Sequence, residues 1–196
     1  SACLVGSEMC IRDRCQGSDG AKLPTVALAL RLFCDSAEAW VRGRAAFSAA
    51  GPLLRFSLIH LESGSPSLLS SCFHLDERVV SFLLGSNDPP AALVARSQFV
   101  QPVPDGQFLH GELAARLTAL LERALTPGES ERLMVNLFGP VGAGKRTVAA
   151  AACAALNVPV LASKASVLLA EQTLLLFLRE ASLQQAAPYL DCCLLY

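Results

Sequence analysis

A glycine-rich segment at residues 139–147 carries residue types that bind phosphate. Its sequence, Gly-Pro-Val-Gly-Ala-Gly-Lys-Arg-Thr, follows the pattern Gly-x-x-x-x-Gly-Lys. Glycines at both ends of this pattern permit backbone angles that turn successive N–H groups toward a phosphate. The lysine adds a charge for the outer phosphates, and a helix that begins there adds the positive end of its dipole. We therefore expect nucleotide binding by Gly139, Pro140, Val141, Gly142, Ala143, Gly144, Lys145, Arg146 and Thr147.

The residue after the lysine decides whether such a loop also holds magnesium. Loops of this type place serine or threonine there, because the hydroxyl binds the Mg²⁺ that bridges the outer phosphates. Here the position holds Arg146, and Thr147 follows it. One residue along a helix is a rotation of about 100°, so Thr147 should not reach the same ligand position. The sequence predicts nucleotide binding with weak or absent hydrolysis.

Asp191 is the candidate magnesium ligand, because it ends the last apolar run before the end of the chain. An acid at the end of a strand beside such a loop commonly holds the metal. The alternative, a surface aspartate without a role, stays open. Cys192 stands where a general-base glutamate often follows. We assign no catalytic residue, and the expected ligands are a nucleotide and magnesium.

The elements that would position these residues follow Glu131. Short apolar runs alternate there with helical segments, which predicts an α/β fold with a parallel sheet and right-handed crossover helices. The predicted strands cover 133–138, 158–163 and 187–191, and the predicted helices cover 144–156 and 166–183.

The chain before this region is mainly helical by its pattern. Apolar residues three and four apart predict helices over Thr25–Phe33 and Glu77–Gly85, whereas the segment around Pro52 suits either a helix or a strand. Prolines and an Asp-Gly pair make Phe99–Phe108 the expected linker. An amphipathic helix should follow over Gly111–Leu125. Its apolar face would carry Leu113, Leu117, Leu120, Leu121 and Leu125.

Composition excludes several function classes. With 53% hydrophobic and 17% charged residues among 196, the chain can bury a core, and its net charge of −1 gives no electrostatic case for nucleic acid or an anionic membrane. The eight cysteines form no Cys-x-x-Cys pair, which argues against a metal site. The longest uncharged run, Thr147–Ser163, is interrupted by Asn157 and Pro159, so we expect a soluble, cytoplasmic protein.

Basic and histidine side chains add no further site. The histidines are too far apart in sequence to indicate a catalytic cluster: His60, His74 and His110. The arginines of the first half are scattered, which argues against a nucleic-acid surface: Arg31, Arg42, Arg44, Arg55 and Arg78.

Both ends of the chain have an unusual sequence. The opening "CLVGSEMCIRDR" and the closing "CLLY" resemble translated sequencing-adapter segments. We therefore expect residues 1–14 and 193–196 to be artefactual, and the remainder to be an internal fragment of a longer protein.

Two stretches together resemble a known family. "LFGPVGAGKRTVAAAACAALNVPVL" and "FLREASLQQAAPYLD" are similar to the start of an AAA+ ATPase module of the prokaryotic tandem-module type. The upstream runs "PTVALALRLF", "PLLRFSLIHLE" and "FHLDERVVSFLLG" look like the winged-helix-type region that precedes that module. The resemblance covers roughly Pro24 to Asp191 and divides the chain into a winged-helix-like region (15–98), a linker with a helix (99–130) and part of the ATPase module (131–192).

This resemblance implies an ATPase whose intact form assembles into a homo-oligomeric ring and acts on a protein or other macromolecular partner. It assigns residues 139–147 to the nucleotide and Asp191 to the metal. The first module of such proteins is often imperfect, so this one is expected to bind ATP without efficient turnover. The alternative is a winged-helix-like protein or DNA interaction module in which the loop is a relic.

Overall fold

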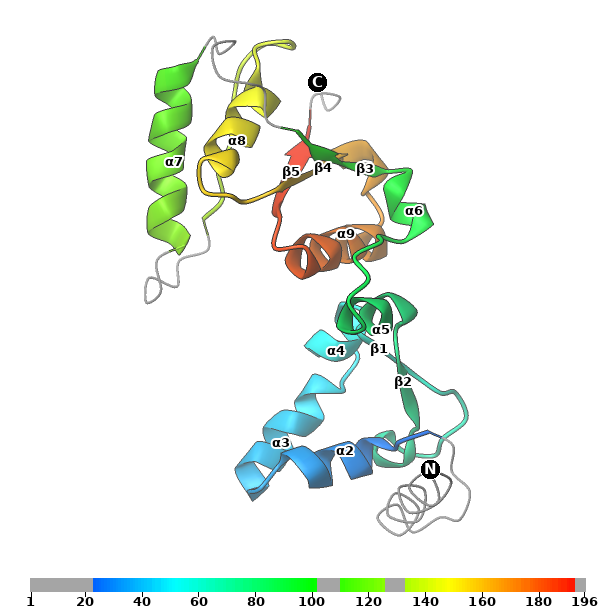
Figure 1. Ribbon diagram of the computed structural model, residues 1–196. Coiled ribbons are helices and arrows are strands. Elements are labelled where there is room, and N and C mark those ends of the chain that lie inside the picture. The colour runs from blue at the N-terminus through cyan, green and yellow to red at the C-terminus, as the bar shows by residue number, and fades with distance from the viewer. Residues whose placement is uncertain (1–22, 102–109, 126–132, 193–196) are drawn as a thin grey trace. The chain divides into compact units, whose positions relative to one another are not determined.

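The computed structural model describes residues 23–101, 110–125 and 133–192. The chain divides into two compact units, Ser1–Ser86 and Asn87–Tyr196 (Figure 1). The sequence placed a boundary after residue 98, whereas the division found here precedes Asn87. Each unit has its own hydrophobic clusters.

The first unit combines helices with a small antiparallel ribbon. Strands β1 and β2 pair so that His60 lies opposite His74. The elements, in chain order, are α2 (Val26–Phe33), α3 (Ala37–Ala46), α4 (Pro52–Arg55), β1 (Ile59–Leu61), the 3₁₀ turn η1 (Leu68–Ser70), β2 (Phe73–Leu75) and α5 (Glu77–Leu83).

Side-chain caps and one apolar face explain the helices of this unit. Thr25 caps α2, Ser36 caps α3 and Asp76 caps α5, each by accepting a hydrogen bond from a backbone N–H of the first turn. The apolar face of α2 is buried against residues from α3, α4 and the ribbon. The core consists of Val26, Ala29, Leu30, Phe47 and Ile59.

The predicted helices of this unit are confirmed, at Val26–Phe33 and Glu77–Leu83. The segment around Pro52 contains both of the structures that its pattern allowed, since α4 begins at Pro52 and β1 follows at Ile59. The chain then leaves α5 through Gly85, whose φ of 91° is closed to most other residues.

The second unit is built around a three-stranded sheet of order β3-β4-β5. β4 and β5 are parallel, and β3 is antiparallel to β4. The elements are α6 (Ala91–Val94), β3 (Ser97–Val100), α7 (Gly111–Leu125), α8 (Lys145–Ala154), β4 (Val160–Lys164), the 3₁₀ turn η2 (Ala165–Val167), α9 (Glu171–Leu183) and β5 (Ala187–Asp191).

Helices pack against the sheet and against one another. Leu161 of β4 packs with Phe177 and Ala181 of α9, while α8 lies against β4 and β5. The first four residues of β4 are buried, as expected for a central strand with both faces covered. α7 and α8 lie side by side (Figure 1), joined by an apolar cluster that includes Leu117 and Val148.

The prediction that three parallel strands form this sheet was wrong in two respects. The run Leu133–Phe138 is not a strand, and most of its side chains are exposed, including Phe138 at 87%. Its place as third strand is taken by β3, which spans the predicted boundary between the winged-helix-like region (15–98) and the linker, and which runs antiparallel to β4. An apolar run becomes a strand only where a neighbour pairs with its backbone, and local sequence does not encode that pairing.

The remaining elements of this unit agree with the sequence. α7, α8, β4, α9 and β5 all form where their patterns predicted them, although η2 precedes α9. In the amphipathic face of α7, Leu117 is buried, Leu121 is partly buried, and Leu113 and Leu120 remain 44% and 49% exposed. Most of the predicted linker, 102–109, lies outside the described residues, as do the segments 1–14 and 193–196 whose sequence suggested an artefact.

Candidate phosphate-binding site

The glycine-rich loop links the extended segment 133–138 to the N-terminus of α8. Gly142 has a φ of 82°, and Gly144, which precedes the first residue of α8, has a φ of 76°. An L-residue in this left-handed region costs roughly 1–2 kcal/mol, so the loop conformation depends on glycine at both positions. The sequence predicted such angles at the two ends of the pattern, and Gly139, with a φ of 151°, and Gly144 both have positive φ.

Lys145 turns its side chain back into the loop. Its Nζ atom donates hydrogen bonds to the carbonyl oxygens of Gly139, at 2.9 Å, and Pro140, at 2.8 Å. An ammonium group offers three donors and no acceptor, so one donor remains beyond these two hydrogen bonds. The N-terminus of the ten-residue α8 begins at the same residue and adds the positive end of its dipole.

Arg146 lies in the first turn of α8 and interacts away from Lys145. In the orientation that satisfies both groups, the side-chain oxygen of Gln98 accepts hydrogen bonds from Nη1 and Nη2 of Arg146. Gln98 belongs to β3, so the arginine joins the helix to the edge of the sheet. Thr147 is half-buried one residue further along α8.

A cavity of about 340 Å³ lies beside the first turn of α8. Arg146 and Asp191 both line it, whereas Lys145 and the loop glycines do not. Asp191 is the last residue of β5 and pairs in register with Lys164, the last residue of β4. The structure therefore brings together two of the predicted site residues and places the remaining loop residues outside this cavity.

Three basic residues line the cavity against one acidic residue, Asp191. The polar lining is completed by backbone and hydroxyl groups; the buried Ser163, for example, donates from Oγ to the carbonyl oxygen of Arg96 at 2.7 Å. Magnesium requires oxygen ligands, preferably carboxylates, and this lining does not fit it. The basic residues are Arg96, Arg146 and Lys164.

Sequence reasoning missed Arg96, Gln98 and Lys164 as neighbours of the site. Arg96 and Gln98 belong to the end of the predicted winged-helix-like region, 15–98, so nothing local linked them to the glycine loop. Lys164 could have been found, because it ends a strand whose parallel partner ends at Asp191. In open α/β sheets, ligands bind at the carboxyl ends of parallel strands.

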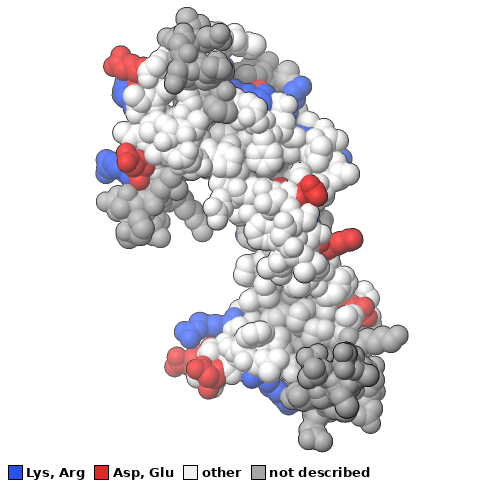
Figure 2. Space-filling view, viewed as in Figure 1, with Lys and Arg blue, Asp and Glu red and all other residues white. Residues whose placement is uncertain are grey.

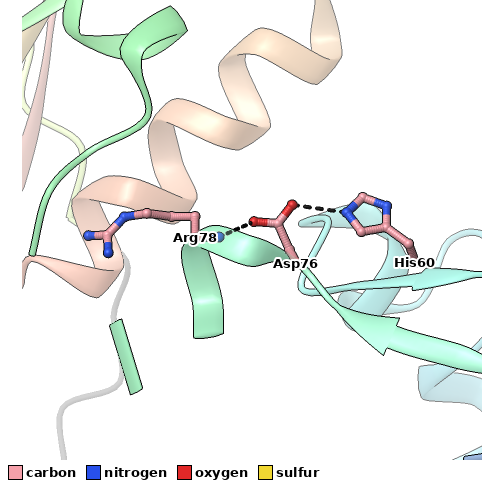
Figure 3. Close-up of polar contacts among 3 residues, drawn as sticks. All are labelled: His60, Asp76 and Arg78. Atoms are coloured by element: carbon pink, nitrogen blue, oxygen red, sulfur yellow. Dashed lines mark hydrogen bonds and ion pairs between the residues drawn. The ribbon is translucent and has the colours of Figure 1, made fainter. Parts of the chain in front are cut away.

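A second polar cluster lies at the ribbon of the first unit (Figure 3). Asp76 accepts a hydrogen bond on Oδ1 from the backbone N–H of Arg78, at 3.0 Å, and its Oδ2 lies 2.9 Å from Nε2 of His60. The ring of His60 lies over that of His74 on the facing strand, with 5.4 Å between centroids. The cluster caps α5 and ties it to β1, which is a structural role.

Other chemistry-bearing residues form no site in the described chain. No group of three or more histidine, cysteine or acidic side chains in residues 23–101, 110–125 and 133–192 is placed to hold a metal. Four described cysteines are thiols, and burial raises the pKa of Cys153 above its ordinary value. Such a shift makes this thiol less reactive.

Comparison with known proteins gives a match to the first part of the chain. Residues 9–97 match the family model described as a winged helix domain, variant. No curated protein and no solved structure matches the chain significantly. The match covers the whole described part of the first unit and ends in β3, and we call residues 9–97 the winged-helix region. Within the described residues, no helix is long and apolar enough to cross a lipid bilayer.

The charges of the winged-helix region are balanced. Residues 9–97 contain nine basic and eight acidic residues, of which five arginines and five acidic residues lie in 23–86. Four of these arginines are exposed and scattered, while Arg78 is buried and donates from Nη1 to the carbonyl oxygen of Ser86. On the face that Figure 2 shows, basic and acidic side chains are interspersed rather than gathered into a basic patch. The described residues of this face form no basic patch of the kind that marks a nucleic-acid-binding surface.

Proposed function

We propose that the chain joins a winged-helix interaction module to a loop that holds ATP and hydrolyses it poorly. The observation that carries the ATP-binding part is the position of Lys145, whose ammonium group lies within the loop at the start of α8. Phosphate oxygens accept hydrogen bonds from an ammonium group and from the backbone N–H groups of a helix N-terminus. The chain would thus bind the outer phosphates chiefly through Lys145 and residues 139–144.

Poor hydrolysis follows from the residues that surround the loop. Arg146 stands at the position of the metal-binding hydroxyl and bonds to Gln98. Asp191 lines a cavity whose other charged residues are basic, which opposes recruitment of Mg²⁺. ATP would therefore bind with little help from magnesium, and this module would act as a nucleotide-dependent structural part of an AAA+ ring.

Within such an assembly, the winged-helix region would bind a protein partner. Its balanced charge supports a protein rather than a nucleic acid as partner. It also leaves large apolar side chains at the surface, including Phe33 at 86% and Val41 at 69% exposed. Exposed apolar and aromatic side chains are the usual anchors of protein–protein contacts.

A second candidate function is favoured by the family match itself. The winged-helix region would then carry the whole activity of this chain, as a protein or DNA interaction module, and the loop would be a relic. The exposed, unpaired run 133–138 favours this candidate, because phosphate-binding loops ordinarily follow a strand of the sheet.

Equilibrium binding of a fluorescent ATP analogue to the full chain separates the two candidates. We expect saturable binding that unlabelled ATP displaces, that Lys145→Ala reduces, and that Arg123→Gln, on exposed α7 surface, leaves unchanged. Folded protein that shows no displaceable binding would overturn the ATP proposal and favour the relic loop. DNA binding with a steep salt dependence would oppose the protein-partner assignment.

A further inference from the structure

The cavity beside α8 has the charge and size of a binding site in its own right. Its volume of about 340 Å³ lies within the range of roughly 300–1,000 Å³ that small-molecule sites occupy. The charged residues that line it carry a formal charge of +2 in total. These are Arg96, Arg146, Lys164 and Asp191.

The position of this cavity in the sheet points to a ligand as well. β4 and β5 are parallel and end side by side at Lys164 and Asp191, so the cavity lies at the carboxyl ends of both strands. Open α/β sheets bind their ligands at that edge. Arg146 reaches the same cavity from α8, and its bond to Gln98 holds the guanidinium in place.

We propose that this cavity is a second anion-binding site, distinct from the loop, that takes the phosphate group of a small phosphorylated molecule. Arginine and lysine together favour a phosphate, because the planar guanidinium binds two oxygens at once and the ammonium adds a point charge. Tyr189 and Val167 line the rest of the cavity. This site stands on its own residues and does not depend on the loop binding ATP.

The phosphate in this cavity could belong to a free molecule or to an ATP molecule held by the loop. The two cases differ in whether binding requires Lys145. A free phosphorylated molecule would bind through Arg96 and Lys164 whether or not Lys145 is present. The outer phosphates of an ATP molecule held by the loop would instead require Lys145 as well. Binding of a phosphate probe that carries no base or sugar should therefore be measured in the Lys145→Ala variant, because only binding to the cavity would persist there.

The test is calorimetric titration of the full chain with inorganic pyrophosphate in magnesium-free buffer. We expect Lys164→Gln and Arg96→Gln each to weaken binding about tenfold, as loss of a charge-assisted hydrogen bond predicts. The matched control Arg123→Gln removes an exposed positive charge outside the cavity and should leave binding unchanged. Asp191→Asn should strengthen binding, because it removes the one negative charge from the lining.

The effects of the Lys145, Lys164 and Arg96 variants on pyrophosphate binding each support or overturn the proposal. Binding that survives Lys145→Ala and falls with Lys164→Gln supports an independent site. Binding that Lys145→Ala abolishes assigns the anion to the loop and overturns the proposal, as does unchanged affinity in Lys164→Gln and Arg96→Gln. The absence of pyrophosphate binding in folded wild-type protein also overturns it, whereas ATP binding by the loop would still be measurable separately.

Discussion

The ammonium group of Lys145 donates a hydrogen bond to the carbonyl oxygen of Gly139, six residues earlier in the chain, at 2.9 Å. This contact closes the glycine loop on the start of α8 and holds a positive charge inside it. A phosphate that enters the loop replaces carbonyl acceptors with charged oxygens, which accept stronger hydrogen bonds from the same group.

Affinity should therefore depend on the outer phosphates of the nucleotide. We expect ATP and ADP to displace a fluorescent ATP analogue at least about tenfold more effectively than AMP, since charged hydrogen bonds contribute roughly 1.5–3 kcal/mol each. Lys145→Ala should lower the affinity for ATP toward the affinity for AMP. Equal displacement by all three nucleotides would place the contact at the base or sugar instead of the loop.

The backbone of Gly144 gives a stability test of the loop. Gly144→Ala places a side chain at a φ of 76° and should destabilise the start of α8 by about 1–2 kcal/mol. Gly111→Ala is the matched control, because it lies in α7 with nothing within 4 Å of the added Cβ. Amide hydrogen exchange of α8 measures the difference, and equal exchange in both variants would contradict the strained loop.

The double role of Asp76 predicts two different effects in the first unit. Asp76→Ala removes the cap of α5 and the contact with His60, and should cost about 1 kcal/mol of unfolding free energy. Asp76→Asn keeps a capping oxygen and should cost less. Trp40, the only tryptophan, packs against the core of this unit, so its fluorescence reports urea unfolding there. A larger loss of unfolding free energy in Asp76→Asn than in Asp76→Ala would contradict the capping role of Asp76.

Burial of Cys153 predicts a pH dependence of the second unit. Desolvation raises the pKa of its thiol in the folded state, so the folded chain holds that proton to higher pH than the unfolded chain does. The resulting stability is complete below the ordinary thiol pKa, about 8.5, and is lost as pH rises above it. Hydrogen exchange of α8 should measure this loss of stability with rising pH. Cys153→Ala should make the pH dependence smaller.

Reactivity gives an independent check on the same thiol. Cys153 is 5% exposed, whereas Cys192 is exposed. A thiol reagent read by mass spectrometry should modify Cys192 first and Cys153 only after unfolding. Equal rates in native protein would contradict the buried position of Cys153.

Local pattern was enough to predict most elements of this fold. The spacing of apolar residues in Val26–Phe33 and Gly111–Leu125 and the glycines around α8 depend only on neighbouring sequence. The failures concern long-range pairing. β3 became a strand because β4 pairs with it, and 133–138 did not because nothing in the described chain pairs with it. Such partners are chosen by tertiary context.

The candidate site was also predictable only in part. The loop residues were evident from their spacing, and Asp191 from its place at a strand end. The cavity that Asp191 shares with Arg146 was not, because it also needs Arg96, whose position follows from the unexpected β3. Its basic lining changed the expected ligand from a metal ion to an anion.

The most direct test of the account is the magnesium dependence of ATP binding in wild-type protein and in Arg146→Ser. The dissociation constant of a fluorescent ATP analogue is measured for both, with chelator and with excess magnesium. We expect lysine-dependent binding that magnesium leaves unchanged in wild type and strengthens in Arg146→Ser, where a hydroxyl again follows Lys145. Wild-type binding that requires magnesium would contradict the claim that Arg146 takes the place of the metal ligand.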